Sequence, residues 1–238
     1  MSSTGAVTNG TIAGAATGGE QGSALSCFRV MPSRYIHWHK LASGRQSSED
    51  RAEVYAHGDD LVVVVADGAG GISGGARASA AVVETARAVA ENPTLDVHDT
   101  DLWATLLKEA DSTMAAKTAG ETTAVIVVVG PNGLTGISVG DSEAWIVDRT
   151  SIDDLTRSQE RLRLGSGRAA PVAFQRRCLD GVLLVATDGL FKFASAGQIA
   201  ATVRAGEVSR AAERLTALVQ LPSGGFQDDV GIVVVAAG

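Results

Sequence analysis

Acidic residues stand at the ends of three short, strongly apolar segments of this chain. The segments are rich in β-branched residues, and each lies beside an aspartate: residues 61–66 before Asp67, residues 182–186 before Asp188, and residues 230–235 after Asp228 and Asp229. Short runs of this kind are typical of buried strands. Carboxylates gathered at strand ends repel one another unless a cation neutralises them, and their oxygens suit a hard divalent cation. The sequence therefore predicts a metal site.

The composition favours one folded domain and argues against nucleic-acid binding. Hydrophobic residues make up 45% of the 238 residues, which is enough for a core. The net charge of −7 comes with no basic stripe, so the chain is a poor match to nucleic acid. The two cysteines, Cys27 and Cys178, form no CxxC pattern, which excludes a cysteine-based zinc site.

The N-terminal segment, residues 1–22, is rich in Gly, Ala, Thr and Ser and contains neither Lys nor Arg. It lacks the basic start and the apolar stretch of a signal peptide, so we expect a flexible tail. No apolar run reaches the roughly 20 residues needed to cross a bilayer. These observations predict a cytoplasmic protein without a membrane partner, in which residues 23–238 form one domain.

The order of the predicted elements indicates an α+β fold. Strands are expected at residues 35–41, 52–56, 61–66, 122–129, 134–139, 144–147, 172–178, 182–186 and 230–235, and helices at 74–91, 101–117, 196–204 and 208–219. A single helical turn is expected at residues 190–194, and residues 153–170 are expected to be polar and irregular. Tight turns join several neighbouring strands, so the sheets should be antiparallel rather than built from parallel βαβ units.

Each acidic motif alone also fits a simpler interpretation. The glycines that follow Asp67 fit an ordinary turn, Asp188 fits a cap for the short helix after it, and the Asp228-Asp229 pair fits a polar loop. Three aspartates at strand ends, each with glycine in an adjacent turn or loop, favour a shared metal site instead. A globular α+β domain that binds a structural cation stays open as an alternative.

Six short motifs then appear in order along the chain. They are Arg45 four residues before Glu49-Asp50, Asp67-Gly68-Ala69-Gly70-Gly71, Gly120-Glu121-Thr122-Thr123-Ala124, Gly140-Asp141-Ser142 followed by Ala144-Trp145, Thr187-Asp188-Gly189-Leu190-Phe191, and Asp228-Asp229-Val230. Together they resemble the motifs of the metal-dependent protein phosphatases of the protein phosphatase 2C family. The resemblance covers residues 45–235, which is nearly the whole chain.

The resemblance implies a β-sandwich of two antiparallel sheets flanked by helix pairs, in a four-layer αββα arrangement. It also implies a bacterial-type serine/threonine protein phosphatase, in which a water activated by two Mn²⁺ or Mg²⁺ ions attacks the phosphoester. The partner would be a phosphorylated protein, made by a Ser/Thr kinase, and the enzyme is expected to be a monomer.

The same resemblance gives the site residues their roles. The implied metal ligands are Glu49, Asp50, Asp67, Gly68, Asp141, Asp188 and Asp228. Asp67 would bridge both ions, with Gly68 offering its carbonyl oxygen. Asp188 and Asp228 would hold the first ion, and Asp141 with Asp188 would support a third, weaker ion. The implied catalytic residues are Arg45, Asp67 and Asp188, and the guanidinium of Arg45 would grip the substrate phosphate.

The chain departs from the family pattern at four places. Ala69 stands where many eukaryotic members have a histidine, Gly231 replaces a frequent threonine, and Asp229 replaces the usual asparagine, which adds negative charge near the site. Residues 152–170 are short for the flap region of the family. Two other functions therefore stay open: a phosphatase for small phosphorylated metabolites or a phosphorylated anti-sigma partner, and a pseudophosphatase that binds a partner without turnover.

Overall fold

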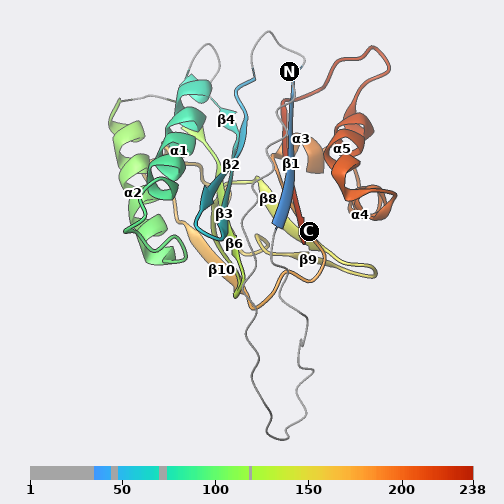
Figure 1. Ribbon diagram of the computed structural model, residues 1–238. Coiled ribbons are helices and arrows are strands. Elements are labelled where there is room, and N and C mark those ends of the chain that lie inside the picture. Colours follow the sequence, from blue (N-terminus) through green and yellow to red (C-terminus); the bar gives the residue numbers. More distant parts are fainter. Residues whose placement is uncertain (1–34, 44–47, 70–73, 118–119, 238) are drawn as a thin grey trace, which may run out of the picture.

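The computed structural model describes residues 35–43, 48–69, 74–117 and 120–237, and the structural statements that follow concern these residues. Two sheets face each other at the centre, and helices cover their outer sides (Figure 1). The predicted tail, residues 1–22, and the predicted phosphate-binding residue Arg45 lie outside the described residues, so both stay predictions. The division into this tail and one domain of residues 23–238 likewise stays a prediction.

Both large sheets have five strands. The first has the order β1-β12-β11-β8-β9 and contains β1 (Tyr35–Ala42), β8 (Glu143–Val147), β9 (Ile152–Asp154), β11 (Val182–Ala186) and β12 (Val230–Ala237). The second has the order β10-β7-β6-β3-β2 and contains β2 (Arg51–His57), β3 (Asp60–Ala66), β6 (Ala124–Gly130), β7 (Gly133–Val139) and β10 (Val172–Arg176). A small sheet pairs β4 (Gly68–Ala69) with β5 (Glu121–Thr122). All of these pairs are antiparallel, as predicted.

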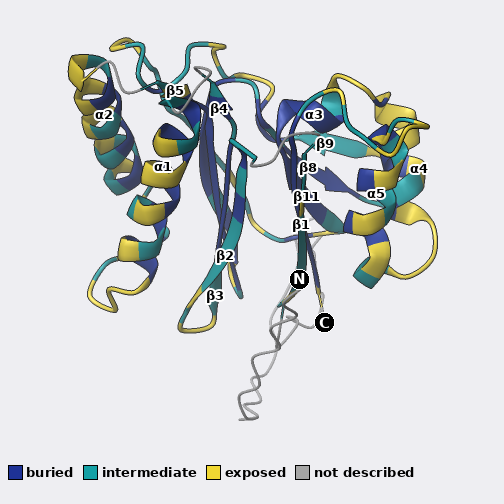
Figure 2. Ribbon diagram, turned by 90° about the horizontal axis from the view of Figure 1, so that it is seen from above, coloured by how far each residue is buried: buried dark blue, intermediate teal, exposed yellow. Residues whose placement is uncertain are grey.

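The helices lie in pairs on the two outer faces. The pair α1 (Gly74–Ala90) and α2 (Thr100–Lys117) covers the second sheet, and the pair α4 (Ala196–Arg204) and α5 (Ala211–Val219) covers the first. The short helix α3 (Asp188–Phe191) lies at one end of the first sheet. Seen from above in Figure 2, helices, sheet, sheet and helices follow one another. The predicted four-layer αββα sandwich is confirmed.

The central strands lack a polar-apolar alternation because both of their faces are buried. On β3, Val62 and Val64 pack against the α1 and α2 side, whereas Val63 and Val65 pack between the two sheets. On β12, Ile232 packs toward α4 and α5. Continuous β-branched runs are therefore what these positions require, and they account for the pattern in the sequence.

The structure refines three expected elements. The single strand expected at residues 122–129 is divided into β5 and β6, because Thr123 turns its N–H to the carbonyl oxygen of Asp67. The segment expected to be irregular contains β9, and Leu164 forms an isolated antiparallel bridge with Thr122. The helix expected at residues 208–219 begins as a 3-10 turn, η1 (Val208–Arg210), before α5. In each case a local detail changes while the order of elements stays the same.

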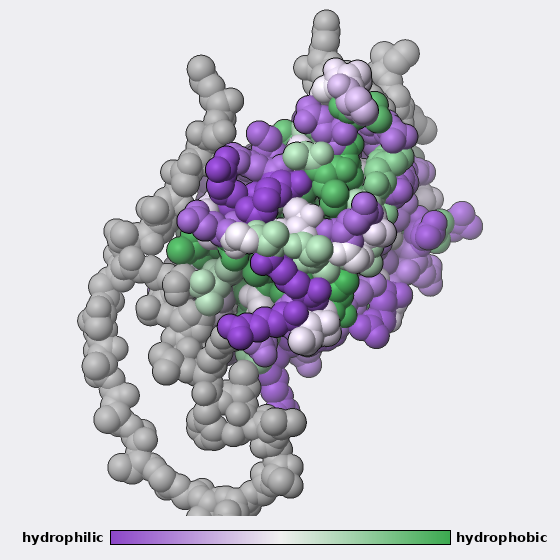
Figure 3. Space-filling view, turned by 90° about the vertical axis from the view of Figure 1, so that its right-hand side faces the viewer, coloured by the Kyte–Doolittle hydropathy of each residue, from purple (hydrophilic) through white to green (hydrophobic). Residues whose placement is uncertain are grey.

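The outer face of α4 and α5 mixes hydrophilic and hydrophobic side chains, as Figure 3 shows. Residues such as Leu215 and Val219 of α5 lie on the opposite face and are buried against the first sheet. Among the described residues, none of the helices combines the length and the apolar character needed to cross a membrane.

Candidate metal centre

Five aspartates come to one end of the sandwich because antiparallel pairing places the start of one strand beside the end of the next. Arg51 pairs with Ala66, which sets Asp50, just before β2, beside Asp67, just after β3. In the first sheet, Ala186 pairs with Ile232, which sets Asp188 near the segment before β12. The remaining members of the group are Asp141, in the turn after β7, and Asp228.

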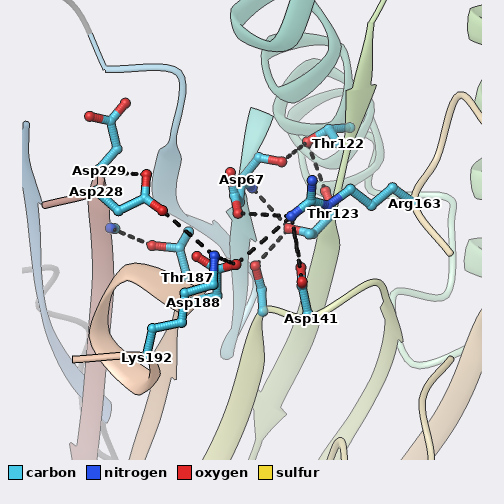
Figure 4. Close-up of polar contacts among 12 residues, drawn as sticks. Asp67, Thr122, Thr123, Asp141, Arg163, Thr187, Asp188, Lys192, Asp228 and Asp229 are labelled. Carbon is cyan, nitrogen blue, oxygen red and sulfur yellow. Dashed lines mark hydrogen bonds and ion pairs between the residues drawn. The ribbon is translucent and has the colours of Figure 1, made fainter. Parts of the chain in front are cut away.

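Three of these carboxylates form a tight cluster. One carboxylate oxygen from each of Asp67, Asp141 and Asp188 lies within 4.8 Å of the others. The side chains point toward one another from different strand ends (Figure 4). Asp141, which the sequence assigned only to a third ion, is thus a full member of the cluster together with Asp67 and Asp188.

A hydrogen-bond network holds the backbone of Asp67. Its N–H donates to Thr123 Oγ1 at 2.9 Å, and its carbonyl oxygen accepts from Thr122 Oγ1 and from the Thr123 N–H, both at 2.9 Å. Thr123 Oγ1 also lies 2.6 Å from Ser142 Oγ, next to Asp141. Buried hydroxyls therefore link two of the three clustered aspartates and restrict their positions.

Glycine at position 68 is required by the close approach of α1. A Cβ added to Gly68 would clash with the carbonyl of Gly75, near the start of α1, and with the carbonyl oxygen of Glu49. The glycine directly after Asp67 thus has a packing cause, because the backbones of α1, of Gly68 and of the segment at Glu49 lie in direct contact here.

Burial and mutual repulsion make these carboxyls hard to ionise. Burial raises the pKa of Asp50 to about 8, and the nearby charge of Asp67 adds to the effect. Burial and the charge of Asp188 raise the pKa of Asp67 to about 6, although Arg163 opposes the shift. Burial also raises the pKa of Asp188, against the effect of Lys192. Asp50 is only 2% exposed, and among the described residues its Oδ2 has no hydrogen-bond partner.

This donor set fits a hard divalent cation. It consists of carboxylate oxygens at short mutual distances, with a buried and unpartnered oxygen of Asp50 beside them. Mg²⁺ and Mn²⁺ prefer such oxygen ligands, and a bound cation would favour the charged form of carboxyls whose pKa values are raised first by burial and then by mutual repulsion.

Two basic side chains also reach the cluster, and the sequence motifs had given neither of them a place in it. The guanidinium Nη2 of Arg163 lies 3.2 Å from Asp141 Oδ1, 3.7 Å from Asp67 Oδ2 and 3.8 Å from Asp188 Oδ2. Lys192 Nζ lies 2.6 Å from Asp188 Oδ2 and 3.6 Å from Asp228 Oδ2 (Figure 4). Lys192 stands four residues after Asp188, which is the one signal that the sequence offered for this pair.

Asp228 and Asp229 have different surroundings although they are adjacent. The side chain of Asp228 is 37% exposed and lies outside the three-carboxylate cluster. Lys192 links it to the cluster, because its ammonium lies near both Asp228 and Asp188. Asp229 is buried and accepts hydrogen bonds from Ser43 Oγ and, at 2.8 Å, from the N–H of Glu49. The acid that replaces the usual asparagine therefore anchors the Glu49-Asp50 segment.

The chain belongs to the protein phosphatase 2C family. The family described as Protein phosphatase 2C matches residues 40–164, which is more than half of the chain. The resemblance inferred from the motifs is thereby confirmed, and with it the assignment to a family of protein phosphatases. Sequence comparison with curated proteins finds no match.

Solved structures of bacterial phosphatases share the fold. The serine/threonine phosphatase Stp1 from Staphylococcus aureus has a TM-score of 0.71 at 19% identity, with 92% of this chain and 99% of that chain covered. A bacterial serine phosphatase has a TM-score of 0.71 at 19% identity, covering 86% and 97%. The catalytic domain of PstP, solved in complex with two manganese ions, has a TM-score of 0.69 at 23% identity, covering 85% and 96%.

Proposed function

We propose that this protein hydrolyses phosphoserine and phosphothreonine on other proteins in a metal-dependent reaction. The observation that carries the proposal is the cluster of Asp67, Asp141 and Asp188 at strand ends, in a chain of the protein phosphatase 2C family. When bound, two Mn²⁺ or Mg²⁺ ions would supply an activated water and positive charge against the dianionic phosphoester.

Several side chains and one backbone carbonyl would together bind the ions. The proposed ligands are Glu49, Asp50, Asp67, Gly68, Asp141, Asp188 and Asp228. The hydroxyls of Thr122 and Thr123 hold the backbone of Asp67, which supports its role as the central ligand. Asp229 would keep the Glu49-Asp50 segment in place through its bond to the Glu49 N–H. Arg45 is proposed to bind the substrate phosphate with its planar, two-pronged guanidinium.

The first test is turnover of p-nitrophenyl phosphate and of a phosphothreonine peptide with Mn²⁺, with Mg²⁺ and with EDTA. Turnover that requires metal supports the proposal, and Asp67→Asn or Asp188→Asn is expected to reduce it by at least about 100-fold while the fold is retained. Asp101→Asn, an exposed acid on α2, is the matched control and should retain full activity. Wild-type turnover by Asp67→Asn at saturating Mn²⁺ would contradict the ligand assignment.

One observation favours a second candidate, a partner-binding pseudophosphatase. Arg163 and Lys192 already pair with the clustered carboxylates, so side-chain charges offset part of the repulsion that a metal would relieve. This candidate predicts no turnover with either metal. A small-molecule phosphatase would instead show a much higher kcat/KM on phosphorylated metabolites than on the phosphothreonine peptide.

We also propose that the substrate is a product of a Ser/Thr kinase and that the protein acts as a monomer in the cytoplasm. The acidic net charge of −7 supports a protein partner rather than a nucleic acid. Light scattering coupled to size exclusion would test the monomer, because a mass near twice the 24.3 kDa of the chain would exclude it.

A further inference from the structure

The proposed metal centre carries cations of its own. Lys192 Nζ lies between two carboxylates, 2.6 Å from Asp188 Oδ2 and 3.6 Å from Asp228 Oδ2 (Figure 4). These are the two aspartates to which the proposed function gives the first metal ion. The ammonium is thus placed where it interacts with both carboxylates at once, as a divalent cation would.

Arg163 has the same relation to the other carboxylates. Its Nη2 lies within 3.8 Å of oxygens from Asp67, Asp141 and Asp188, and closest to Asp141. Unlike Lys192, whose side chain is 50% exposed, the Arg163 side chain is only 23% exposed. One cation therefore reaches the site from the solvent side, and the other lies within its wall.

Backbone structure places both cations near the acids. The N–H of Lys192 donates to the carbonyl oxygen of Asp188 at 2.8 Å, so α3 sets the two side chains one helical turn apart. Arg163 precedes Leu164, whose N–H and carbonyl both bond to Thr122, at 2.9 and 3.0 Å. Both cations are therefore carried by segments whose backbone is hydrogen-bonded beside the site.

We propose that Lys192 and Arg163 are built-in competitors of the divalent metal ion and limit the metal affinity of this protein. The inference rests on the proposed function for the identity of the metal site. To bind at Asp188 and Asp228, a divalent ion must displace the Lys192 ammonium or tolerate its charge a few ångströms away. Arg163 opposes an ion at Asp67 and Asp141 in the same way. Metal binding therefore has to work against the positive charge of these two side chains.

The expected effect follows from the charges. At the same distance of about 4 Å, a divalent cation repels a unit positive charge twice as strongly as a monovalent cation does. Exposure to solvent reduces this repulsion. Removing the Lys192 charge should therefore tighten Mn²⁺ binding by roughly 5- to 30-fold. Removing the less exposed Arg163 charge should have an effect at least as large on the ion nearest Asp141.

Isothermal titration calorimetry with Mn²⁺ alone, on the full chain, measures this effect without reference to activity. The variants are Lys192→Gln and Arg163→Gln, each with the wild type as reference. Lys192→Arg keeps the charge and should keep the wild-type affinity. Lys108→Gln, an exposed residue of α2, removes the same charge far from the cluster and controls for net charge.

The outcomes separate this inference from the proposed function. If Lys192→Gln binds Mn²⁺ more tightly than the wild type does and Lys108→Gln does not, the competition is supported. The same holds if the wild type binds too weakly to measure and Lys192→Gln binds measurably. Equal or weaker binding by Lys192→Gln, in a wild type that binds Mn²⁺, overturns the competition and leaves the metal-dependent phosphatase intact. No Mn²⁺ binding by any variant overturns both.

Discussion

Replacing Asp111 with alanine is expected to destabilise the segment that carries Arg163. Asp111 lies on α2 and is only 4% exposed. Its Oδ1 accepts the N–H groups of Gly165 at 2.7 Å and Gly167 at 2.9 Å, and its Oδ2 accepts that of Ala169 at 3.0 Å. A single carboxylate thus fixes three backbone amides just after Arg163 to the helix.

The size of the effect can be worked from these three bonds. A hydrogen bond to a charged group contributes about 1.5–3 kcal/mol, but water can replace part of it where the amides are partly exposed. Taking about 1 kcal/mol for each bond, Asp111→Ala should lower the free energy of unfolding by about 3 kcal/mol. For a chain of this size the expected fall in Tm is about 6–12 °C.

Thermal denaturation followed by circular dichroism measures the change in Tm. Ser112→Ala is the matched control, because the Ser112 hydroxyl donates to the Lys108 carbonyl oxygen on the exposed side of the same helix, and it should move Tm by less than about 2 °C. Asp111→Asn should fall between the two, since one carboxylate oxygen is replaced by a donor. A fall below about 2 °C for Asp111→Ala would refute the reasoning.

Three further outcomes are expected. In EDTA, the free energy of unfolding should fall as pH rises from about 4 to about 8. The pKa of Asp50 is about 8 in the folded state, against an ordinary value of 3.8. Between these two values the folded state therefore holds a proton that the unfolded state has lost, and raising the pH favours unfolding. Asp50→Asn should flatten this slope in thermal denaturation, and an unchanged slope would exclude Asp50 as its source. Gly189→Ala should cost about 2–4 kcal/mol in urea denaturation, because its Cβ would clash with the carbonyl of Asp229, whereas at Gly197 a Cβ meets no atom within 4 Å and alanine should be neutral or stabilising. Asp229→Ala should lose about 1–3 kcal/mol, because the N–H of Glu49 loses this acceptor, and an unchanged free energy of unfolding would contradict the anchoring role of Asp229.

The strands and the acidic cluster were predictable because their signals are local. A β-branched run such as residues 61–66 reports a strand buried on both faces, and the Asp that follows it marks where that strand ends. Antiparallel pairing brings strand ends together within each sheet, but Asp67 and Asp188 belong to different sheets, so their meeting depends on how the two sheets face each other. The boundary of β6 was less predictable, because it depends on the bond from Thr123 to the distant Asp67.

The sequence did not predict that Arg163 and Lys192 lie beside the carboxylates. As with the boundary of β6, contacts between distant segments decide much of this placement. Arg163 reaches the carboxylates through the bridge between Leu164 and Thr122 and through the anchoring by Asp111, which join segments far apart in sequence. Asp111 itself looks like an ordinary polar position of a helix, and only the fold shows that it is buried. Lys192 had a local signal, but four-residue spacing on a helix usually marks a weak surface pair.

The strand order also determines when the site can first exist during synthesis. The strands of the second sheet lie between residues 51 and 176, where β8 and β9 of the first sheet also stand, and they hold the positions of Asp67 and Asp141. The first sheet pairs β1 with β12, so it cannot close until residues 230–237 have left the ribosome. Asp188 follows β11, which pairs with β8 on one side and with β12 on the other, so its surroundings are complete only at that point. A nascent chain therefore holds the three clustered aspartates before β12 is made, whereas Asp228, just before β12, and the closed first sheet come only with that strand.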